Sequence, residues 1–312
     1  MLADARVVVT GGAGFIGSHL VDALLARGCE VTCIDDLVGT AGTTRNLDHI
    51  AGAARFVFLQ EDICRWAERA DLRGVDVVFH LAASKNSVSL DDPERDLAVN
   101  ALGTLRVLRA AARDGVSRVV HSSTGSVVGE TELPHAPDVP TRPVSYYGVS
   151  KLAGESYCRA VGGLTGLEYA VLRYYHVIGR RQDASDRGGV LPIFVRRALA
   201  GKPLLIEGDG QQTRSFTSVH DAVSANLIAA VHTDARGALL HCASAVRVSV
   251  AELAAYVLER TGSRAGFRHV APRPGDIRRF EVDNSALERL GLHFDKDWRA
   301  TVRDVIASRP AA

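Results

Sequence analysis

A glycine-rich segment near the start of the chain constrains the fold more than any other feature. It reads Gly11-Gly12-Ala13-Gly14-Phe15-Ile16-Gly17 and follows an apolar, β-branched run at Arg6–Thr10. After it come Leu20 and Leu24, which share one helical face with Ile16. Glycines allow a tight turn and let a helix pack closely against a strand. The segment therefore predicts a strand, a turn and a helix, the first unit of a parallel α/β sheet.

The rest of the first half repeats this alternation of short apolar runs and longer amphipathic segments. Strands are expected over Glu30–Asp35, Arg55–Gln60, Val75–Leu81 and Val116–Ser122, and helices over Phe15–Arg27 and Asn100–Asp114. Such an alternation is typical of a doubly wound, parallel Rossmann sheet with helices on both faces. We therefore predict an α/β fold built on this sheet.

The pattern changes after Tyr174, where a stretch rich in Gly, Arg and Asp runs from residue 179 to 189. Helical segments follow at Leu191–Ala200, Val250–Thr261 and Thr301–Ile306. We predict a dinucleotide-binding Rossmann domain at residues 1–175 and a smaller substrate-binding α/β domain at residues 176–312. The prediction leaves room for segments of the second domain to return to the first.

Composition narrows the classes of partner. The 312 residues carry a net charge of +1, and Lys and Arg form no block of five or more, so neither nucleic acid nor a membrane surface is an expected partner. No apolar run reaches about 18 residues and the start lacks a signal peptide, which predicts a cytoplasmic protein. The five cysteines form no CxxC pair, and no metal site or disulfide is expected.

The glycine segment also predicts a binding site for a dinucleotide. Gly11 would make the turn, Gly14 would let the backbone approach a pyrophosphate, and the helix N-terminus would offer N–H groups to the anion. Asp35 ends the second strand, where a carboxylate accepts hydrogen bonds from the adenosine ribose and repels a 2′-phosphate. This favours NAD over NADP. Asp62 follows the next strand and would meet the adenine amino group.

Tyr147 and Lys151 form a candidate catalytic pair, because they lie four residues apart at the start of a predicted helix and share one face. A tyrosine with its usual pKa of about 10 is a poor base. A nearby ammonium and a positive nicotinamide ring are expected to lower that pKa. Thr124 ends a predicted strand, which would bring its hydroxyl to the carboxyl edge of the sheet beside Tyr147.

Together these motifs resemble the extended short-chain dehydrogenase/reductases, in the branch of nucleotide-sugar epimerases and dehydratases. The resemblance covers almost the whole chain and includes His80-Leu81-Ala82-Ala83, Arg173-Tyr174 and the segment from Gly208 to Arg214. It implies that Thr124, Tyr147 and Lys151 are catalytic. It implies a cofactor-binding set of Gly11, Gly14, Phe15, Ile16, Gly17, Asp35, Asp36, Asp62, Ile63, Leu81, Ala82, Ala83, Lys85, Asn100, Ser122, Tyr147, Lys151 and Tyr174.

The same resemblance implies a nucleoside-diphosphate sugar as substrate, most simply a UDP-sugar. Its contacts would come from Lys85, Thr124, Tyr147, His176, Arg214 and Arg273. The two arginines match those that grip the diphosphate, which a guanidinium binds through two parallel hydrogen bonds. His176 stands where similar enzymes have Asn, and two roles stay open for it: pairing with a phosphate or sugar carboxylate, or packing at the domain junction.

The residues after Thr124 favour one reaction within this branch. The 4,6-dehydratases carry Asp-Glu there to eliminate water, whereas this chain has Gly125 and Ser126. We therefore predict an NAD-dependent 4-epimerase of the UDP-glucose/UDP-galactose type that works through a transient 4-keto sugar. The alternatives are a UDP-glucuronate or UDP-N-acetylhexosamine 4-epimerase, an NAD(P)H-dependent keto-sugar reductase, and a non-catalytic dinucleotide sensor.

The resemblance further implies a homodimer. Related enzymes associate through a four-helix bundle, which here would use the helix after Asn100 and the helix that carries Lys151. Leu102, Leu105 and Leu108 suit either a sheet-facing or a partner-facing stripe on the first of these helices.

Overall fold

The computed structural model describes residues 2–40, 42–131, 134–186, 188–272 and 281–309. At its centre is a seven-stranded sheet of order β11-β6-β5-β4-β1-β2-β3, in which every neighbouring pair is parallel. Its strands are β1 (Arg6–Thr10), β2 (Glu30–Asp35), β3 (Phe56–Gln60), β4 (Val77–His80), β5 (Arg118–Thr124), β6 (Glu168–Tyr174) and β11 (Leu239–Cys242). The predicted Rossmann sheet is confirmed.

The strand order places the site. From β1 the chain continues outward through β2 and β3 on one side, and then through β4, β5 and β6 on the other. Ligands bind in the crevice at the carboxyl ends of the strands, where the order reverses. That crevice lies between β1 and β4, beside the glycine segment.

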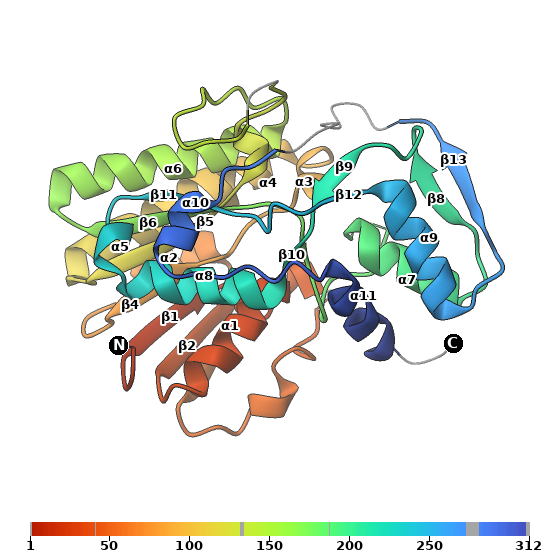
Figure 1. The fold of residues 1–312 in the computed structure, drawn as a ribbon. Helices are drawn as coiled ribbons and strands as arrows, with labels where there is room; N and C mark the ends of the chain where they lie inside the picture. Colours follow the sequence, from red (N-terminus) through yellow and green to blue (C-terminus); the bar gives the residue numbers. More distant parts are fainter. Residues whose placement is uncertain (1, 41, 132–133, 187, 273–280, 310–312) are drawn as a thin grey trace.

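Helices cover both faces of the sheet (Figure 1). On one face α1 (Phe15–Leu25) and α8 (Val219–Val231) share a hydrophobic core with β1. On the other, α2 (Ile63–Arg69), α5 (Thr104–Asp114) and α6 (Tyr146–Thr165) share a second core with Val78 and Val119 of the sheet. Short segments nearby are η1 (Val38–Thr40), η2 (Asp48–Ile50), α3 (Asn86–Ser89), α4 (Pro93–Leu97), η4 (Gly125–Val127) and η5 (Thr233–Ala235).

The helix predicted over Asn100–Asp114 is divided in the structure. A π-helical turn, η3 (Ala98–Gly103), comes first, and α5 begins only at Thr104. The Thr104 hydroxyl donates to the Asn100 carbonyl at 2.6 Å. A Cβ at Gly103 would lie 3.3 Å from Cγ2 of Ile63, so this turn packs tightly on α2.

A smaller unit at one end of the sheet holds α7 (Val190–Leu199), α9 (Val250–Thr261) and α11 (Trp298–Ala307), with a core that includes Phe194, Leu253 and Trp298 (Figure 1). Three two-stranded sheets border it: β7 (Val177–Ile178) with β10 (Thr217–Ser218), β8 (Leu204–Glu207) with β13 (Phe267–Val270), and β9 (Thr213–Ser215) with β12 (Arg247–Ser249). The short helix α10 (Ser285–Arg289) contacts β11.

The chain crosses between the large sheet and the smaller unit more than once. Both α8 and β11 follow residue 175, yet they belong to the large sheet and its covering layer. The domain boundary at residue 175 stays a prediction. The segments that return to the large sheet interleave the two units. None of the helices in the described ranges is long and apolar enough to cross a lipid bilayer.

Candidate active site

The glycine segment makes the close turn that its sequence predicts. Gly11 has φ +71°, and a Cβ there would lie 2.6 Å from the backbone nitrogen of Ala82 at the end of β4. A Cβ at Gly17 would lie 2.1 Å from the Gly11 carbonyl oxygen. No side chain fits either position, so α1 starts directly beside the strand ends. Gly14 caps α1 without a side-chain hydrogen bond, which leaves N–H groups of the first turn for an anion.

A cavity of about 480 Å³ runs along this edge of the sheet. It begins at Asp35 and Asp36 and reaches Tyr147. Most of the predicted cofactor residues line it: Gly11, Gly14, Phe15, Ile16, Gly17, Asp35, Asp36, Ile63, Leu81, Ala82, Ala83, Lys85, Ser122, Tyr147 and Tyr174. We call this cavity the cofactor cleft. Of the other three, Asp62 lines the neighbouring cavity, whereas Asn100 and Lys151 are buried behind the walls.

Asp35 is held in place at one end of the cofactor cleft. Its Oδ2 accepts from the N–H of Ala13 at 3.0 Å and its Oδ1 from the N–H of Leu37 at 2.8 Å. Burial raises the pKa of this carboxyl, while the two N–H groups act in the opposite direction. The carboxylate is therefore oriented toward the glycine segment, where it suits ribose hydroxyls and disfavours a 2′-phosphate.

At the other end of the cleft, Thr124 and Tyr147 lie together. Thr124 is the last residue of β5, and Tyr147 lies in the first turn of α6, whose cap Ser145 accepts from the N–H of Gly148 at 3.0 Å. Thr124 lies near enough to the Tyr147 hydroxyl to lower the pKa of that phenol, and its own Oγ1 donates to Ser126 Oγ at 3.3 Å. The shared contact of Thr124 and Tyr147 with one sugar oxygen stays a prediction.

The pKa of Tyr147 corrects part of the sequence-based expectation. Burial raises the pKa of the phenol to about 12, and the Asp96 carboxylate acts in the same direction, while the Thr124 hydrogen bond only partly opposes them. We expected an ammonium and a positive nicotinamide ring together to lower this pKa. In the protein alone desolvation outweighs the opposing effect, and the lowering with a bound cofactor stays a prediction.

Lys151 is buried, with 1% of its surface exposed. Its Nζ finds no hydrogen-bond partner among the described residues. Burial lowers the pKa of the amine to about 8, although Cys158, Glu155 and Asp96 favour its charged form. Buried donors are nearly always paired in native proteins. Ribose hydroxyls of a nicotinamide cofactor would supply the missing acceptors, so NAD fits the residues present.

Asn100 supports the cleft from behind. Its Oδ1 accepts from the N–H of Ser84 at 2.9 Å, and its Nδ2 donates to Asp96 Oδ1 at 2.9 Å and to Ser150 Oγ at 3.1 Å. Asn100 thereby ties the segment after β4 to the turn of α6 that carries Lys151. The structure places it as a support of the wall.

His80 is a further supporting residue, for which the sequence offered only its place in a family motif. The Thr104 hydroxyl donates to a carbonyl, so its oxygen accepts from His80 Nε2 at 3.0 Å. His80 Nδ1 then accepts from the Thr10 hydroxyl at 2.7 Å. Burial lowers the pKa of His80 to about 3, which keeps the ring neutral. The chain of bonds joins β1, β4 and α5 under the glycine segment.

An ion pair that the sequence did not reveal lies at the edge of the cleft. Lys85 Nζ is 3.0 Å from Asp183 Oδ2 and 3.4 Å from the carbonyl oxygen of Gly39. Lys85, Gly39 and Asp183 all line the cavity. These groups come from segments after β4, β2 and β7, so the ion pair connects the sheet to the loop of the smaller unit.

We expect Asp183→Asn to speed the release of bound NAD. A partly exposed ion pair contributes little, so an increase of about two- to fivefold in the release rate is expected. Release can be followed by trapping free NAD with an excess of a second dehydrogenase. Asp186→Asn is the matched control, because Asp186 pairs with Arg196 away from the cleft. Equal rates for the two variants would contradict a closing role for the Lys85–Asp183 pair.

On the substrate side, His176 packs at the junction between the two units. Its φ is +38°, and its ring makes an edge contact with Phe216, with centroids 6.4 Å apart. Burial lowers the pKa of His176 to about 3, and Arg214 acts in the same direction. In the protein alone the ring packs against Phe216, and its pairing with a phosphate or sugar carboxylate stays a prediction.

The structure describes only Arg214 of the two arginines that we predicted to bind the diphosphate. Arg214 lies in β9 with 8% of its surface exposed, and its Nη1 donates to the carbonyl of Thr213 at 2.9 Å. Its guanidinium is thus held close to His176. Arg273 lies outside the described residues.

The space next to Thr124 is filled by an aromatic ring. A Cβ at Gly125 would lie 2.2 Å from Cε1 of Tyr175. Tyr175 is buried, and its hydroxyl is 3.1 Å from Nδ1 of His135. An acidic side chain at position 125 would therefore require Tyr175 to move.

The sheet order, the glycine turn and the placement of Thr124, Tyr147 and Lys151 define an extended short-chain dehydrogenase/reductase. Comparison with known proteins gives the family. The model of the "NAD dependent epimerase/dehydratase family" matches residues 7–240. The chain belongs to this family of NAD-dependent enzymes.

Among its relatives, the UDP-glucose 4-epimerase of Mycolicibacterium smegmatis is 38% identical over 92% of each chain. A solved UDP-N-acetylglucosamine 4-epimerase from Methanobrevibacter ruminantium, in complex with UDP-N-acetylmuramic acid, superposes with a TM-score of 0.91 at 32% identity over 98% of each chain. The UDP-glucuronic acid 4-epimerase of Bacillus cereus, bound to UDP-glucuronic acid and NAD, has a TM-score of 0.88 at 29% identity over 97% of this chain and 99% of its own.

Proposed function

We propose that this enzyme is a 4-epimerase of UDP-hexoses, with UDP-glucose and UDP-galactose as its substrate pair. One observation carries the proposal: Tyr147 ends the cofactor cleft with Thr124 beside it, and an acid at the next position, Gly125, would require the Tyr175 ring to move. Oxidation and reduction at one carbon need only the hydroxyl pair, Lys151 and NAD. Elimination of water would need an additional acid and base at that position.

In the proposed mechanism, NAD bound in the cleft would supply the hydride acceptor and donor for C4. Tyr147 as phenolate takes the proton of the C4 hydroxyl, and Thr124 holds the same oxygen. Lys151 lies on the Tyr147 face of α6 and orients the nicotinamide ribose. A 4-keto sugar results, and Tyr147 returns the proton after the sugar has turned over.

The nucleotide must stay bound while the sugar turns. We propose that Arg214 holds the diphosphate through parallel hydrogen bonds, with Arg273 as its partner from the sequence pattern. The diphosphate linkage is then the axis of rotation. His176 limits this part of the site by its bulk next to Arg214 and carries no charge.

Incubation with single substrates tests the proposal. The purified protein, without added cofactor, is given UDP-glucose, UDP-galactose, UDP-glucuronate or UDP-N-acetylglucosamine, and C4 inversion is followed by proton NMR. We expect interconversion of the first two. Inversion of UDP-glucuronate or UDP-N-acetylglucosamine alone would select the corresponding alternative. No inversion, with reduction of an added keto-sugar by NADH, would make the enzyme a reductase.

We also propose that the enzyme works as a cytoplasmic homodimer. The adjoining surfaces of η3, α5 and α6 leave apolar side chains exposed, among them Leu102 of η3 (41%) and Val149 (53%) and Leu164 (86%) of α6. Leu105 is partly buried and Leu108 is fully buried in the core beneath the sheet. Of the three predicted leucines, Leu102 is therefore the most exposed to a second copy. Two copies of this pair of helices would form the four-helix bundle that the resemblance implies.

Leu102→Glu is expected to shift the protein from dimer to monomer, because a charge would be buried in the bundle without a partner. Light scattering after gel filtration measures the molar mass. Val270→Glu provides the control, since Val270 on β13 is equally exposed at 40% but lies in the smaller unit. A Leu102→Glu variant that stays dimeric would rule out this interface.

A further inference from the structure

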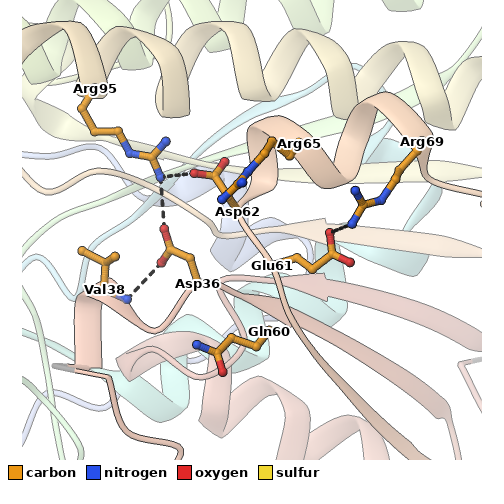
Figure 2. A pocket seen from close by; sticks show the side chains of 8 residues that line it. All are labelled: Asp36, Val38, Gln60, Glu61, Asp62, Arg65, Arg69 and Arg95. Atoms are coloured by element: carbon orange, nitrogen blue, oxygen red, sulfur yellow. Dashed lines mark hydrogen bonds and ion pairs between the residues drawn. The ribbon is translucent and has the colours of Figure 1, made fainter.

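Arg95 lies at the boundary between the cofactor cleft and a neighbouring cavity of about 530 Å³, and it lines both. Figure 2 shows its side chain reaching from α4 toward two carboxylates, Asp36 and Asp62. Asp36 also lines both cavities, whereas Asp62 lines the outer one. The outer cavity is thus a continuation of the cleft at its acidic end.

The guanidinium of Arg95 connects the ends of two strands. Its Nη2 is 2.6 Å from Asp62 Oδ2 and 3.1 Å from Asp36 Oδ2 (Figure 2). The remaining oxygens are also engaged: Asp36 Oδ1 accepts from the N–H of Val38 at 3.1 Å, and Asp62 Oδ1 from the N–H of Cys64 at 2.7 Å. Arg95 therefore fixes the positions of both carboxylates.

The pairing also favours the charged form of Asp62. Burial favours the neutral form of Asp62, but the hydrogen bonds from Arg95 and Cys64 outweigh it and lower the pKa of that carboxyl. Asp62 stays ionised and accepts hydrogen bonds through its unused lone pairs. Because Arg95 is paired with two carboxylates, its charge is not free to bind a ribose 2′-phosphate.

We propose that Arg95 is a positioning residue for the adenosine half of NAD. It holds Asp62 as an acceptor for the adenine amino group and Asp36 as an acceptor beside the ribose. This inference depends on the proposed placement of adenosine at the Asp35 end of the cleft. It is independent of which sugar the enzyme converts.

The neighbouring residue distinguishes this role from mere support of the fold. Asp96, next to Arg95 on α4, accepts from Asn100 in the wall behind the catalytic end. If Arg95 served only to hold α4, its loss would disturb both ends of the cleft. If it positions the adenosine contacts, only ligands with an adenosine half would bind more weakly.

Calorimetric titration of the full-length protein, freed of nucleotide, separates the two halves of the cofactor. AMP and ADP-ribose report on the adenosine end, and nicotinamide mononucleotide reports on the other. We expect Arg95→Ala to weaken the binding of AMP and ADP-ribose about tenfold, the typical effect of losing hydrogen bonds to a charged group. Binding of nicotinamide mononucleotide should not change.

Two further variants complete the test. Arg65→Ala removes an exposed arginine of the same outer cavity and should bind every ligand as the wild type does. Arg95→Lys keeps the positive charge but loses the planar guanidinium, and it should recover part of the lost affinity. This variant also keeps the test valid if Arg95→Ala folds poorly. Unchanged AMP binding in both Arg95 variants would overturn the proposal, as would an equal loss for AMP and nicotinamide mononucleotide. If the wild-type protein bound neither AMP nor ADP-ribose, adenosine would not lie at the Asp35 end of the cleft. The proposal for Arg95 would then be wrong, whether or not the protein is an epimerase.

Discussion

Tyr147→Phe is expected to lower kcat for C4 inversion by about 10²- to 10⁴-fold, the usual contribution of a positioned acid–base group. The substitution removes only the phenolic oxygen of a residue that lines the end of the cleft, beside Thr124. The ring still fills its place, so the affinity for the UDP-sugar should stay close to that of the wild type. Proton NMR of the substrate mixture gives the rate, and calorimetry gives the affinity.

The adjacent tyrosine provides a matched control. Tyr146 is 58% exposed at the start of the same helix, and Tyr146→Phe is expected to keep the wild-type rate. If Tyr147→Phe were as active as Tyr146→Phe, the proton would have to leave by another group. The assignment of Tyr147 would then be wrong.

Lys151→Met is expected to abolish turnover and, in the protein without NAD, to raise stability. Burial lowers the pKa of Lys151 from 10.5 to about 8, which corresponds to a cost of about 3 kcal/mol for keeping the amine charged in the folded protein. Methionine has a similar length and needs no acceptor. The free energy of unfolding at pH 7 should therefore increase by an amount of this order.

The gain from Lys151→Met should depend on pH with a definite sign. Between pH 8 and 10.5 the unfolded chain binds more protons than the folded one, so the wild type gains stability as the pH rises. The advantage of the variant is full below pH 8 and disappears as the pH passes 10.5. Urea unfolding at several pH values measures it, with the exposed Lys202→Met as control. A variant less stable than the wild type at pH 7 would contradict the cost assigned to the buried amine.

Much of the fold could be predicted from local pattern. The strands at Arg6–Thr10 and Glu30–Asp35 have the predicted bounds, because a buried parallel strand between glycine and polar residues leaves a clear signal. The π-helical turn before α5 had no such signal, since it depends on how Gly103 packs against Ile63. The return of α8 and β11 to the large sheet is likewise a matter of tertiary packing.

For the site, too, local motifs could be predicted from the sequence but contacts between distant segments could not. Residues within one motif, such as the glycines and the Tyr147–Lys151 pair, could be placed from spacing alone. The ion pairs Lys85–Asp183 and Arg95–Asp36 join residues 98 and 59 positions apart, which no single-sequence pattern reveals. The raised pKa of Tyr147 was also missed, because the sequence shows the lysine four residues away but not the degree of burial.

The return of one hydride to the carbon that it left is the central claim, and an isotope at C4 tests it most directly. UDP-galactose that carries deuterium at C4 is incubated in ordinary water with the purified enzyme and no added NAD, and the product is analysed by NMR and mass spectrometry. We expect UDP-glucose with the deuterium still at C4. Loss of the deuterium to solvent during inversion, or inversion only when NAD is supplied and consumed in proportion to product, would contradict this mechanism.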